Sequence, residues 1–240
     1  MTEHPVFPKL QDENVKIWRF MDFTKFTSLL DKKSLFFSRS DKLGDPFEGS
    51  MSRVNVKQRA SSYNDNMYKT LDELSKIRKN LRYQTFLNCW HINEVESDAM
   101  WKIYAKDNTG IAIQSTYKRL VDVLKENRSI YVGAVNYIDY DLDSMPETNL
   151  FWPFVHKQKI FKHESELRAI IQNTVINEKE PFKTQPLGVD IQINLDKLIE
   201  KIYVAPTSPK WFYDLVTSVI KKYNLTREIT FSKLSDRPVY

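Results

Sequence analysis

Acidic and basic side chains alternate in one late stretch of the sequence, and these residues are the best suited to chemistry. Glu164, Glu166 and Arg168 alternate with Leu167 and Ala169, which predicts a strand over Glu164–Ile171 with all three charges on one face. A carboxylate placed in this way can favour positive charge at the anomeric carbon of a sugar and can hold a ribose hydroxyl. The alternative, which the strand taken alone favours, is an ion-paired surface that contributes little.

Earlier segments carry candidates that would complete a site if folding brings them to this strand. Arg19 lies on a strand predicted over Val15–Phe20, and a guanidinium can hold a pyrophosphate through two parallel hydrogen bonds. Trp101 and Tyr104 are three residues apart on a predicted helix, so they share a face, and either ring can stack on a nicotinamide. Ser38, on the second predicted strand, can supply a hydroxyl.

The segment Asn88–Gly110 organises these candidates, because polar and aromatic side chains gather there around a strand end. A strand predicted over Thr85–Trp90 is followed by a helix that Ser97 can cap. Ligand sites favour such crevices, although aromatic residues at helical spacing are often core residues instead. Further pocket candidates are Asp45, Glu48, Trp90, His91, Glu96 and Arg168.

Composition excludes several classes of protein. The 36 Lys and Arg outnumber the 31 Asp and Glu, and the only dense basic segment, Lys76–Arg82, is expected to be a solvated helix face before a nucleic-acid surface. A single cysteine, Cys89, excludes an internal disulfide and suits a reducing cytosol. Neither a signal peptide nor a run of membrane-spanning length is present, so we expect a cytoplasmic protein without a membrane partner.

Several common sites are also excluded. The five glycines form no phosphate-cradling loop, so Walker and Rossmann nucleotide sites are absent. A zinc site could be drawn from one cysteine and three scattered histidines, but the set is weak and we expect no metal. These ligands would be Cys89, His91, His156 and His163.

The pattern of the whole chain predicts one α+β domain with a central mixed, mostly antiparallel sheet flanked by helices. Residues 1–14 are expected to form a loose N-terminal arm, and residues 15–240 the domain. Residues 53–82 are expected to form a helical insertion with Leu71, Leu74, Ile77 and Leu81 on one side. We also predict a strand over Ile130–Ile138 and a helix over Leu150–Ile160.

Four stretches of the chain resemble the bacterial domain-of-unknown-function family numbered 2971. The pair Trp18-Arg19 fits this pattern with Trp in place of the family's usual Tyr, and Gly44-Asp45-Pro46 replaces its Asn-Asp-Pro. The resemblance covers about residues 17 to 200 and implies no activity. The stretches are Leu35–Ser38 with Asp45–Glu48, Cys89–Trp90 with Glu96–Ser97 and Met100–Tyr104, Gly110–Ile113, and Lys159–Arg168.

The order of the candidates also resembles the ADP-ribosyltransferases, which use an Arg or His on the first strand, a central Ser or Tyr, and a late Glu. The resemblance implies NAD as the substrate and a toxin or phage-defence effector that modifies a protein or nucleic acid. Glu166 would be the catalytic carboxylate and Glu164 would orient the acceptor, while Arg19 would hold the phosphates or ribose of NAD. Ser38, or alternatively Ser97 with Tyr104, would shape the nicotinamide pocket. The NAD-binding set would be Trp18, Arg19, Ser38, Ser97, Trp101 and Tyr104.

Two other functions stay open. A metal-dependent nuclease could use Asp139 or Asp141 with Glu166, but Arg168 stands where some nucleases have a lysine, and arginine does not give up a proton near neutrality. A non-enzymatic module could instead recognise a nucleotide or peptide through the aromatic turn and Asp45–Glu48. The sequence does not determine the acceptor or the oligomeric state.

Overall fold

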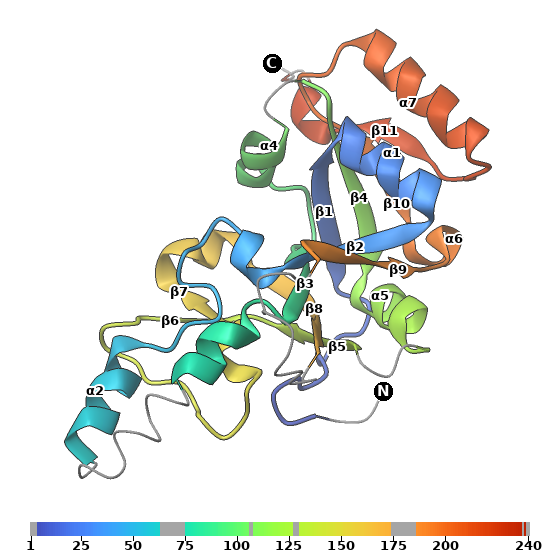
Figure 1. Cartoon of the computed structure of the whole chain (residues 1–240). Coiled ribbons are helices and arrows are strands. Elements are labelled where there is room, and N and C mark those ends of the chain that lie inside the picture. The colour runs from blue at the N-terminus through green and yellow to red at the C-terminus, as the bar shows by residue number, and fades with distance from the viewer. Residues whose placement is uncertain are drawn as a thin grey trace.

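The computed structural model describes residues 4–62, 75–105, 108–126, 130–173, 186–236 and 238 of the chain. A large, mostly antiparallel sheet carries helices around it (Figure 1), which confirms the predicted α+β class. The strands are β1 (Lys16–Asp22), β2 (Ser34–Arg39), β3 (Thr85–Ile92), β4 (Gly110–Thr116), β5 (Ile130–Ala134), β6 (Asn136–Ile138), β7 (His156–Gln158), β8 (Glu166–Gln172), β9 (Gly188–Gln192), β10 (Lys201–Val204) and β11 (Ile229–Phe231). The α-helices are α1 (Phe23–Lys32), α2 (Arg53–Ser62), α4 (Asp98–Tyr104), α5 (Tyr117–Leu124), α6 (Leu195–Leu198) and α7 (Lys210–Lys222), and the 3-10 helices are η1 (Ser40–Lys42), η2 (Trp152–Phe154), η3 (Lys159–Glu164) and η5 (Lys233–Ser235).

The sheet runs in the order β11-β10-β4-β1-β3-β2-β9, and β8 and then β5 extend it from the other edge of β3. Within it, β10 and β11 pair in parallel, while the other described pairs are antiparallel. Strands β6 and β7 form a separate parallel pair. Segments far apart in the sequence meet in this sheet, since β1, β2 and β8 all pair with β3.

Strand β3 is the centre of this sheet, because it pairs with three other strands. One of its edges pairs with β8 over Thr85–His91. Its other edge pairs with β1 at His91–Ile92 and with β2 at Phe86–Leu87. The residues Asn88–Trp90 therefore have no strand partner on that edge, and β1 and β2 diverge there (Figure 1). We call this point the fork of the sheet.

The two faces of β1 belong to different parts of the core. Ile17 and Met21 join the largest core cluster, in which α1, α5, α6 and α7 bury their apolar sides. Trp18 and Phe20 face the other way and pack under α4. Arg19 thus projects opposite to Trp18 and Phe20, as the alternation in the sequence predicts. Each large side chain buried here contributes about 1.5–3 kcal/mol relative to an exposed one.

Side-chain caps start several helices where the sequence indicates. Asp22 accepts a hydrogen bond from the backbone N–H of Lys25 over 2.8 Å, and Ser97 accepts one from Met100 over 3.3 Å. Thr116 caps α5 in the same way. The second contact confirms the predicted cap at Ser97, and each cap satisfies a backbone donor that the first turn leaves free.

The helix predicted over Leu150–Ile160 is wrong. The short turn η2 occupies part of this stretch, and β7 follows it directly. Pro153 suits a first turn but removes a backbone donor, and the alternating residues after it pair with β6. The strand predicted over Ile130–Ile138 is likewise divided into β5 and β6.

The late strand begins two residues after the predicted start. Glu164 is the last residue of η3, and Ser165 adopts a left-handed conformation with φ 39° before β8 begins at Glu166. Glu164 therefore does not alternate with Glu166 and Arg168 along one strand. The bend at Ser165 instead brings the Glu164 side chain back beside that of Glu166.

Two residues of the predicted loose N-terminal arm lie against the domain, while most of residues 8–14 are exposed. Val6 and Phe7 are buried, and Phe7 stacks on Tyr131 with ring centroids 5.2 Å apart. Gly133 lies directly under the Phe7 ring, where an added Cβ would come within 2.9 Å of it. The missing side chain at Gly133 therefore lets the segment lie against β5.

Two described helical segments represent the predicted insertion, α2 and residues 75–81. Leu71 and Leu74 lie outside the described residues. Of the other two apolar positions, Leu81 is buried while Ile77 is 41% exposed. In the part of the chain that the structure describes, each helix is too short or too polar to cross a bilayer.

Candidate functional site

A row of alternating charges lies at the start of β8 and is the centre of the candidate site. Arg168 donates through both Nη atoms to the Glu48 carboxylate, over 2.7 and 2.8 Å, and through Nε to Glu166 over 2.5 Å. Lys157 Nζ donates to Glu166 Oε1 over 3.1 Å and also contacts the Glu164 carboxylate. Each cation of this charged row therefore lies between two carboxylates.

The inner end of the charged row is structural. Arg168 is fully buried and Glu48 is 2% exposed, and Arg168 also donates to the Phe154 carbonyl over 2.7 Å. Burial alone would lower the pKa of Arg168, but the charges of Glu166 and Glu48 outweigh it and raise that pKa well above its usual range. A buried pair with this many hydrogen bonds holds the loop that contains Glu48 against the sheet.

The loop that carries Glu48 is shaped by its own side chains. Asp45 is buried and accepts a hydrogen bond from the backbone N–H of Phe47 over 2.8 Å, which forms a tight turn. Since Glu48 is occupied by Arg168, the polar groups of Asp45–Glu48 point into the fold. The segment is therefore poorly placed to read a peptide, and Phe47 is its exposed apolar residue at 39%.

The two carboxylates at the outer end of the row differ in protonation. Burial would raise the pKa of Glu166, but the charges of Arg168 and Lys157 outweigh it and lower the pKa to about 2. For Glu164, burial and the hydrogen bond to Glu166 raise the pKa to about 7, although Lys157 acts in the opposite direction. Because their pKa values differ, Glu166 stays ionised at neutral pH, whereas Glu164 can exchange a proton there.

Lys157 is the central residue that the sequence analysis missed. It is 6% exposed and lies 4.6 Å from the centre of the Phe161 ring. Burial would lower the pKa of Lys157, but Glu166 and Glu164 outweigh it and raise that pKa, so the ammonium stays charged. Lys157 lies on β7, which is only three residues long. A strand this short shows no alternation of apolar and polar residues from which it could be predicted.

Tyr104 and Cys89 line the next part of the site as neutral groups. Burial, followed by the charges of Cys89, Glu164 and Glu166, raises the pKa of Tyr104 to about 12. Burial, followed by the charge of Glu166, likewise raises the pKa of Cys89 to about 12. The Cys89 thiol is therefore not a nucleophile at neutral pH. Tyr104 is 44% exposed at the end of α4 and can donate its hydroxyl proton.

Arg19 reaches the fork of the sheet from β1. Its Nη2 donates to the carbonyl of Phe36 over 3.4 Å, and its guanidinium carbon lies 6.0 Å from the centre of the Trp90 ring. Its Nη1 is buried and has no hydrogen-bond partner among the described residues. Burial lowers the pKa of Arg19 to about 10, against the charges of Cys89 and Tyr104. A buried charged donor without a partner is costly, which favours a site for an anion.

His91 offers a second buried atom without a partner. It is 5% exposed and lies opposite Glu166 in the pairing of β3 with β8. Its Nδ1 is 2.6 Å from the carbonyl oxygen of Glu164, so Nδ1 carries the proton and donates. Burial lowers the pKa of His91, and its Nε2 has no partner in the described part of the chain. The Nε2 lone pair can therefore accept a hydrogen bond from a ligand.

The two indoles predicted to line the pocket belong to the interior. Trp18 is 1% exposed, and its Nε1 donates to the carbonyl of Asn93 over 2.7 Å. Trp101 is 2% exposed and donates to Glu96 over 3.0 Å. Because neither ring can present a face to a ligand in this conformation, Tyr104 is the aromatic side chain that remains for stacking.

The other predicted residues have structural contacts. Ser97 caps α4, and Glu96 joins Trp101 to the backbone N–H of Lys233 over 2.8 Å. Trp90 is buried and donates to Asn88 over 2.7 Å. Ser38 is half-buried on β2, and its hydroxyl lies 3.5 Å from the Arg39 carbonyl. Tyr104 lies within electrostatic range of Arg19, Cys89, Glu164 and Glu166.

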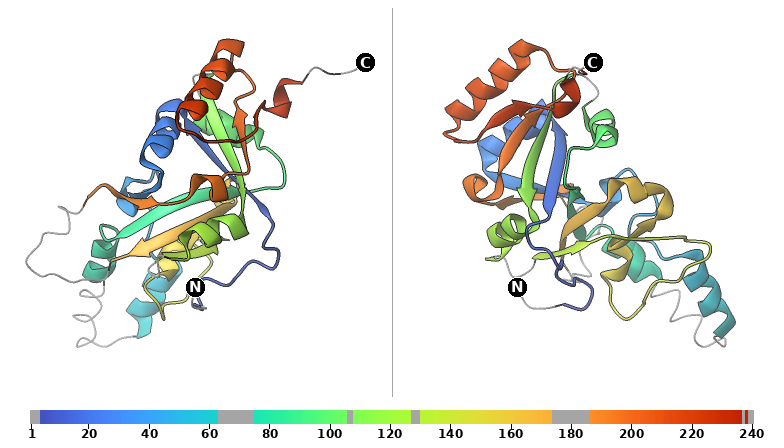
Figure 2. Two further views of the ribbon diagram at one scale, coloured as in Figure 1. Left: turned by 90° about the vertical axis from the view of Figure 1, so that its right-hand side faces the viewer. Right: turned by 180° about the vertical axis from the view of Figure 1, so that it is seen from behind.

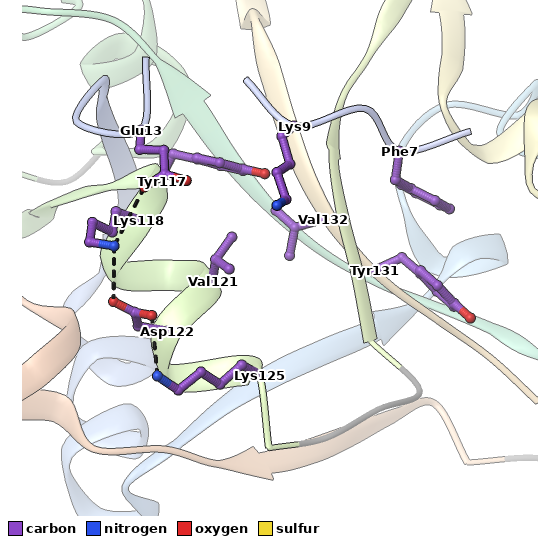
Figure 3. Close-up of a pocket in the computed structure, with 10 residues that line it drawn as sticks. All are labelled: Phe7, Lys9, Glu13, Tyr117, Lys118, Val121, Asp122, Lys125, Tyr131 and Val132. Atoms are coloured by element: carbon purple, nitrogen blue, oxygen red, sulfur yellow. Dashed lines mark hydrogen bonds and ion pairs between the residues drawn. The ribbon is translucent and has the colours of Figure 1, made fainter. Parts of the chain in front are cut away.

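Two hollows lie away from this cluster. A cavity of about 190 Å³ lies between the N-terminal segment, α5 and β5 (Figure 3). There Lys118 pairs with Glu13 and Asp122, and Asp122 also pairs with Lys125, so these charges are balanced at the surface. A more open hollow of about 480 Å³ lies at the end of α7. Neither is bordered by a residue of the charged row.

The nuclease and zinc alternatives find little geometric support. Asp139 accepts from the backbone N–H of Asp141, and Asp141 pairs with Arg53 in an exposed turn. Within the ranges that the structure describes, three or more His, Cys, Asp or Glu side chains nowhere form a group that could hold a metal ion.

The fold and the charged row together define an α+β protein with a partly accessible pair of carboxylates beside a forked sheet. Comparisons with family models, with curated proteins and with solved structures each found no match to this chain. The two resemblances seen in the sequence therefore stay predictions. We infer the function from the geometry of the site.

Proposed function

We propose that this protein is an NAD-using enzyme of the ADP-ribosyltransferase type, acting in the cytoplasm on a protein or nucleic-acid acceptor. One observation carries the proposal: β3 pairs with β1, which contains Arg19, and with β8, which contains Glu166 more than 140 positions later, and Cys89 and Tyr104 lie within electrostatic range of both side chains. This chemistry requires a guanidinium group, an exposed aromatic ring and two carboxyl groups with different pKa values.

The geometry supports exchanging the roles that the resemblance implies for Glu164 and Glu166. Glu166 is neutralised by Lys157 on one side and Arg168 on the other, which weakens its effect on a developing sugar cation. Among the described cations, Glu164 pairs with Lys157 alone, and its pKa lies near neutrality. We therefore assign proton transfer to Glu164 and leave Glu166 as the anchor that positions it.

The remaining groups suit the two ends of the substrate. The free Nη1 of Arg19 would donate to the pyrophosphate, and the Tyr104 ring would lie against the nicotinamide. The acceptor would attack the anomeric carbon while the glycosidic bond breaks and its electron pair leaves with nicotinamide. Glu164 would take the proton that the acceptor gives up.

Labelled NAD, incubated with the purified protein and a cell lysate, tests the proposal through label transfer and nicotinamide release. We expect Glu164→Gln to lower turnover by about 10²- to 10⁴-fold, which is the usual contribution of general acid–base catalysis. Glu228→Gln is the matched control, because Glu228 is 67% exposed and pairs only with Lys201 among the described residues.

The outcomes separate the candidate functions. NAD binding without nicotinamide release would support a binding module, and cleavage of plasmid or RNA that depends on magnesium would support a nuclease. Absence of NAD binding, transfer and hydrolysis in the wild-type protein would overturn the proposal. Equal activity in Glu164→Gln and Glu228→Gln would overturn the role of Glu164.

A further inference from the structure

The net charge of the chain is concentrated in the helical insertion. Residues 53–82 contain eight Lys and Arg against three Asp and Glu, which equals the net charge of +5 of the whole chain. The remaining residues are therefore balanced in charge. Figures 1 and 2 show α2 projecting from one end of the molecule, far from α7 at the other end. We call residues 53–62 and 75–82 the basic insertion.

Several cations of the basic insertion are available to a partner. Lys57 and Lys79 are exposed, and neither forms an ion pair with a described carboxylate. Arg53 pairs with Asp141, but both side chains are more than 60% exposed, so the pair is weak and readily displaced.

The base of the insertion contains a guanidinium pair that shares one carboxylate. Arg59 donates to Glu147 over 2.9 Å, and Arg78 donates to the same carboxylate over 3.3 Å. This leaves one positive charge in excess at a site where both arginines are less than 15% exposed. The Nη1 of Arg78 and the Nε of Arg82 are buried without a hydrogen-bond partner among the described residues. Unpaired guanidinium donors of this kind fit phosphate oxygens.

We propose that the basic insertion binds the phosphate backbone of a nucleic acid. Repeated phosphates can engage exposed cations of the insertion such as Lys57 and Lys79, independently of base sequence. An anionic membrane fits less well, since a surface-lying helix needs a continuous apolar side. In α2, Val54 and Val56 are two positions apart and so lie on different sides of the helix. The inference does not depend on NAD chemistry.

Fluorescence anisotropy of the full chain with labelled duplex DNA, single-stranded DNA and RNA of about 20 nucleotides tests this inference. We expect binding to weaken steeply with salt, as released counterions require. The double substitution Lys57→Gln with Lys79→Gln should weaken binding by about tenfold and reduce the salt slope by about 2. Both lysines are exposed, so this variant should keep its thermal stability.

The double substitution Lys221→Gln with Lys222→Gln on α7 removes the same charge from the far end of the molecule. It should leave the affinity and the salt slope nearly unchanged. Equal weakening in the two double variants would overturn the inference, because only net charge would then matter. Absence of binding to all three probes, or binding to vesicles of phosphatidylserine in place of nucleic acid, would also overturn it.

Discussion

At the scale of single residues, the charged row shows how similar side chains take different roles through their contacts. Glu48 and Glu166 are held by Arg168, whereas the described cation that pairs with Glu164 is Lys157. Each cation that approaches a carboxylate lowers its pKa, and burial without enough cations raises it. Burial raises the pKa of Glu48 even beside Arg168, and it raises the pKa of Glu164, the outermost acid of the row, to about 7.

The pH dependence of stability should report this difference. A carboxyl group whose pKa is raised on folding binds its proton more tightly in the folded state, so it stabilises the fold at low pH. For Glu164 the unfolding free energy should fall as the pH rises from about 4.5 to about 7. For Glu166, whose pKa is lowered, stability should be lost as the pH falls from about 4.5 to about 2.

Urea unfolding of the wild-type protein and of Glu164→Gln between pH 4.5 and 8 measures the first effect. We expect the variant to lack the fall between pH 4.5 and 7, and Glu228→Gln to follow the wild-type curve. Parallel curves for Glu164→Gln and the wild-type protein would show that the pKa of Glu164 is not raised in the fold.

The buried ion pair between Arg168 and Glu48 should dominate stability at this site. Glu48→Ala leaves a fully buried guanidinium without its bidentate partner, which typically costs about 3–5 kcal/mol. Asp141→Ala removes an exposed partner of Arg53 and should cost less than about 1 kcal/mol. Chemical denaturation of both variants provides the comparison, and similar losses would contradict the structural role of Glu48.

At the scale of elements, β3 explains why the candidate residues meet. It accepts β8 along one edge and divides the other between β1 and β2, so Arg19 and Glu166 approach it from opposite sides. The alternation of Val15–Phe20 and the cap at Ser97 could be read from the sequence because both are local signals. The fork and Lys157 could not be, because they depend on strand pairings across long separations.

Aromatic residues illustrate the same limit. The spacing of Trp101 and Tyr104 places both on α4, yet one is 2% and the other 44% exposed. The side of the helix that meets β1 is decided by the partner strand and not by the spacing. For Glu164, the positive φ at Ser165 ends the predicted alternation, and a serine gives little sequence signal for that conformation.

The cap of α4 should influence the site through Tyr104. Ser97→Ala removes the side-chain acceptor for the first turn and should cost about 1 kcal/mol. Thr116→Ala removes the equivalent cap from α5 and should cost a similar amount. Only Ser97→Ala should raise the KM for NAD, because only α4 carries a ring of the proposed pocket. Equal effects of both variants on KM would show that α4 does not position the substrate.

At the scale of the whole molecule, charge is divided between a balanced body and the basic insertion. Long-range attraction of an anionic partner depends on this asymmetry, which orients the approaching molecule toward one end. Glu166 and Arg168 of the charged row lie on β8, whereas α2 of the insertion projects from the rest of the molecule (Figure 2). A nucleic acid held by the insertion would thus be bound by groups separate from those proposed for NAD.

Glu147 both stabilises the basic insertion and neutralises part of its positive charge, because Arg59 and Arg78 donate to its carboxylate. Glu147→Gln removes the carboxylate that Arg59 and Arg78 share, so the free variant should lose about 1–3 kcal/mol of stability. A phosphate backbone can replace the lost anion. A duplex oligonucleotide at low salt should therefore raise the Tm of this variant by more than it raises that of the wild-type protein. Glu228→Gln frees Lys201 on β10 and should show the wild-type shift. An equal shift in all three proteins would place the phosphate contacts outside the arginine pair.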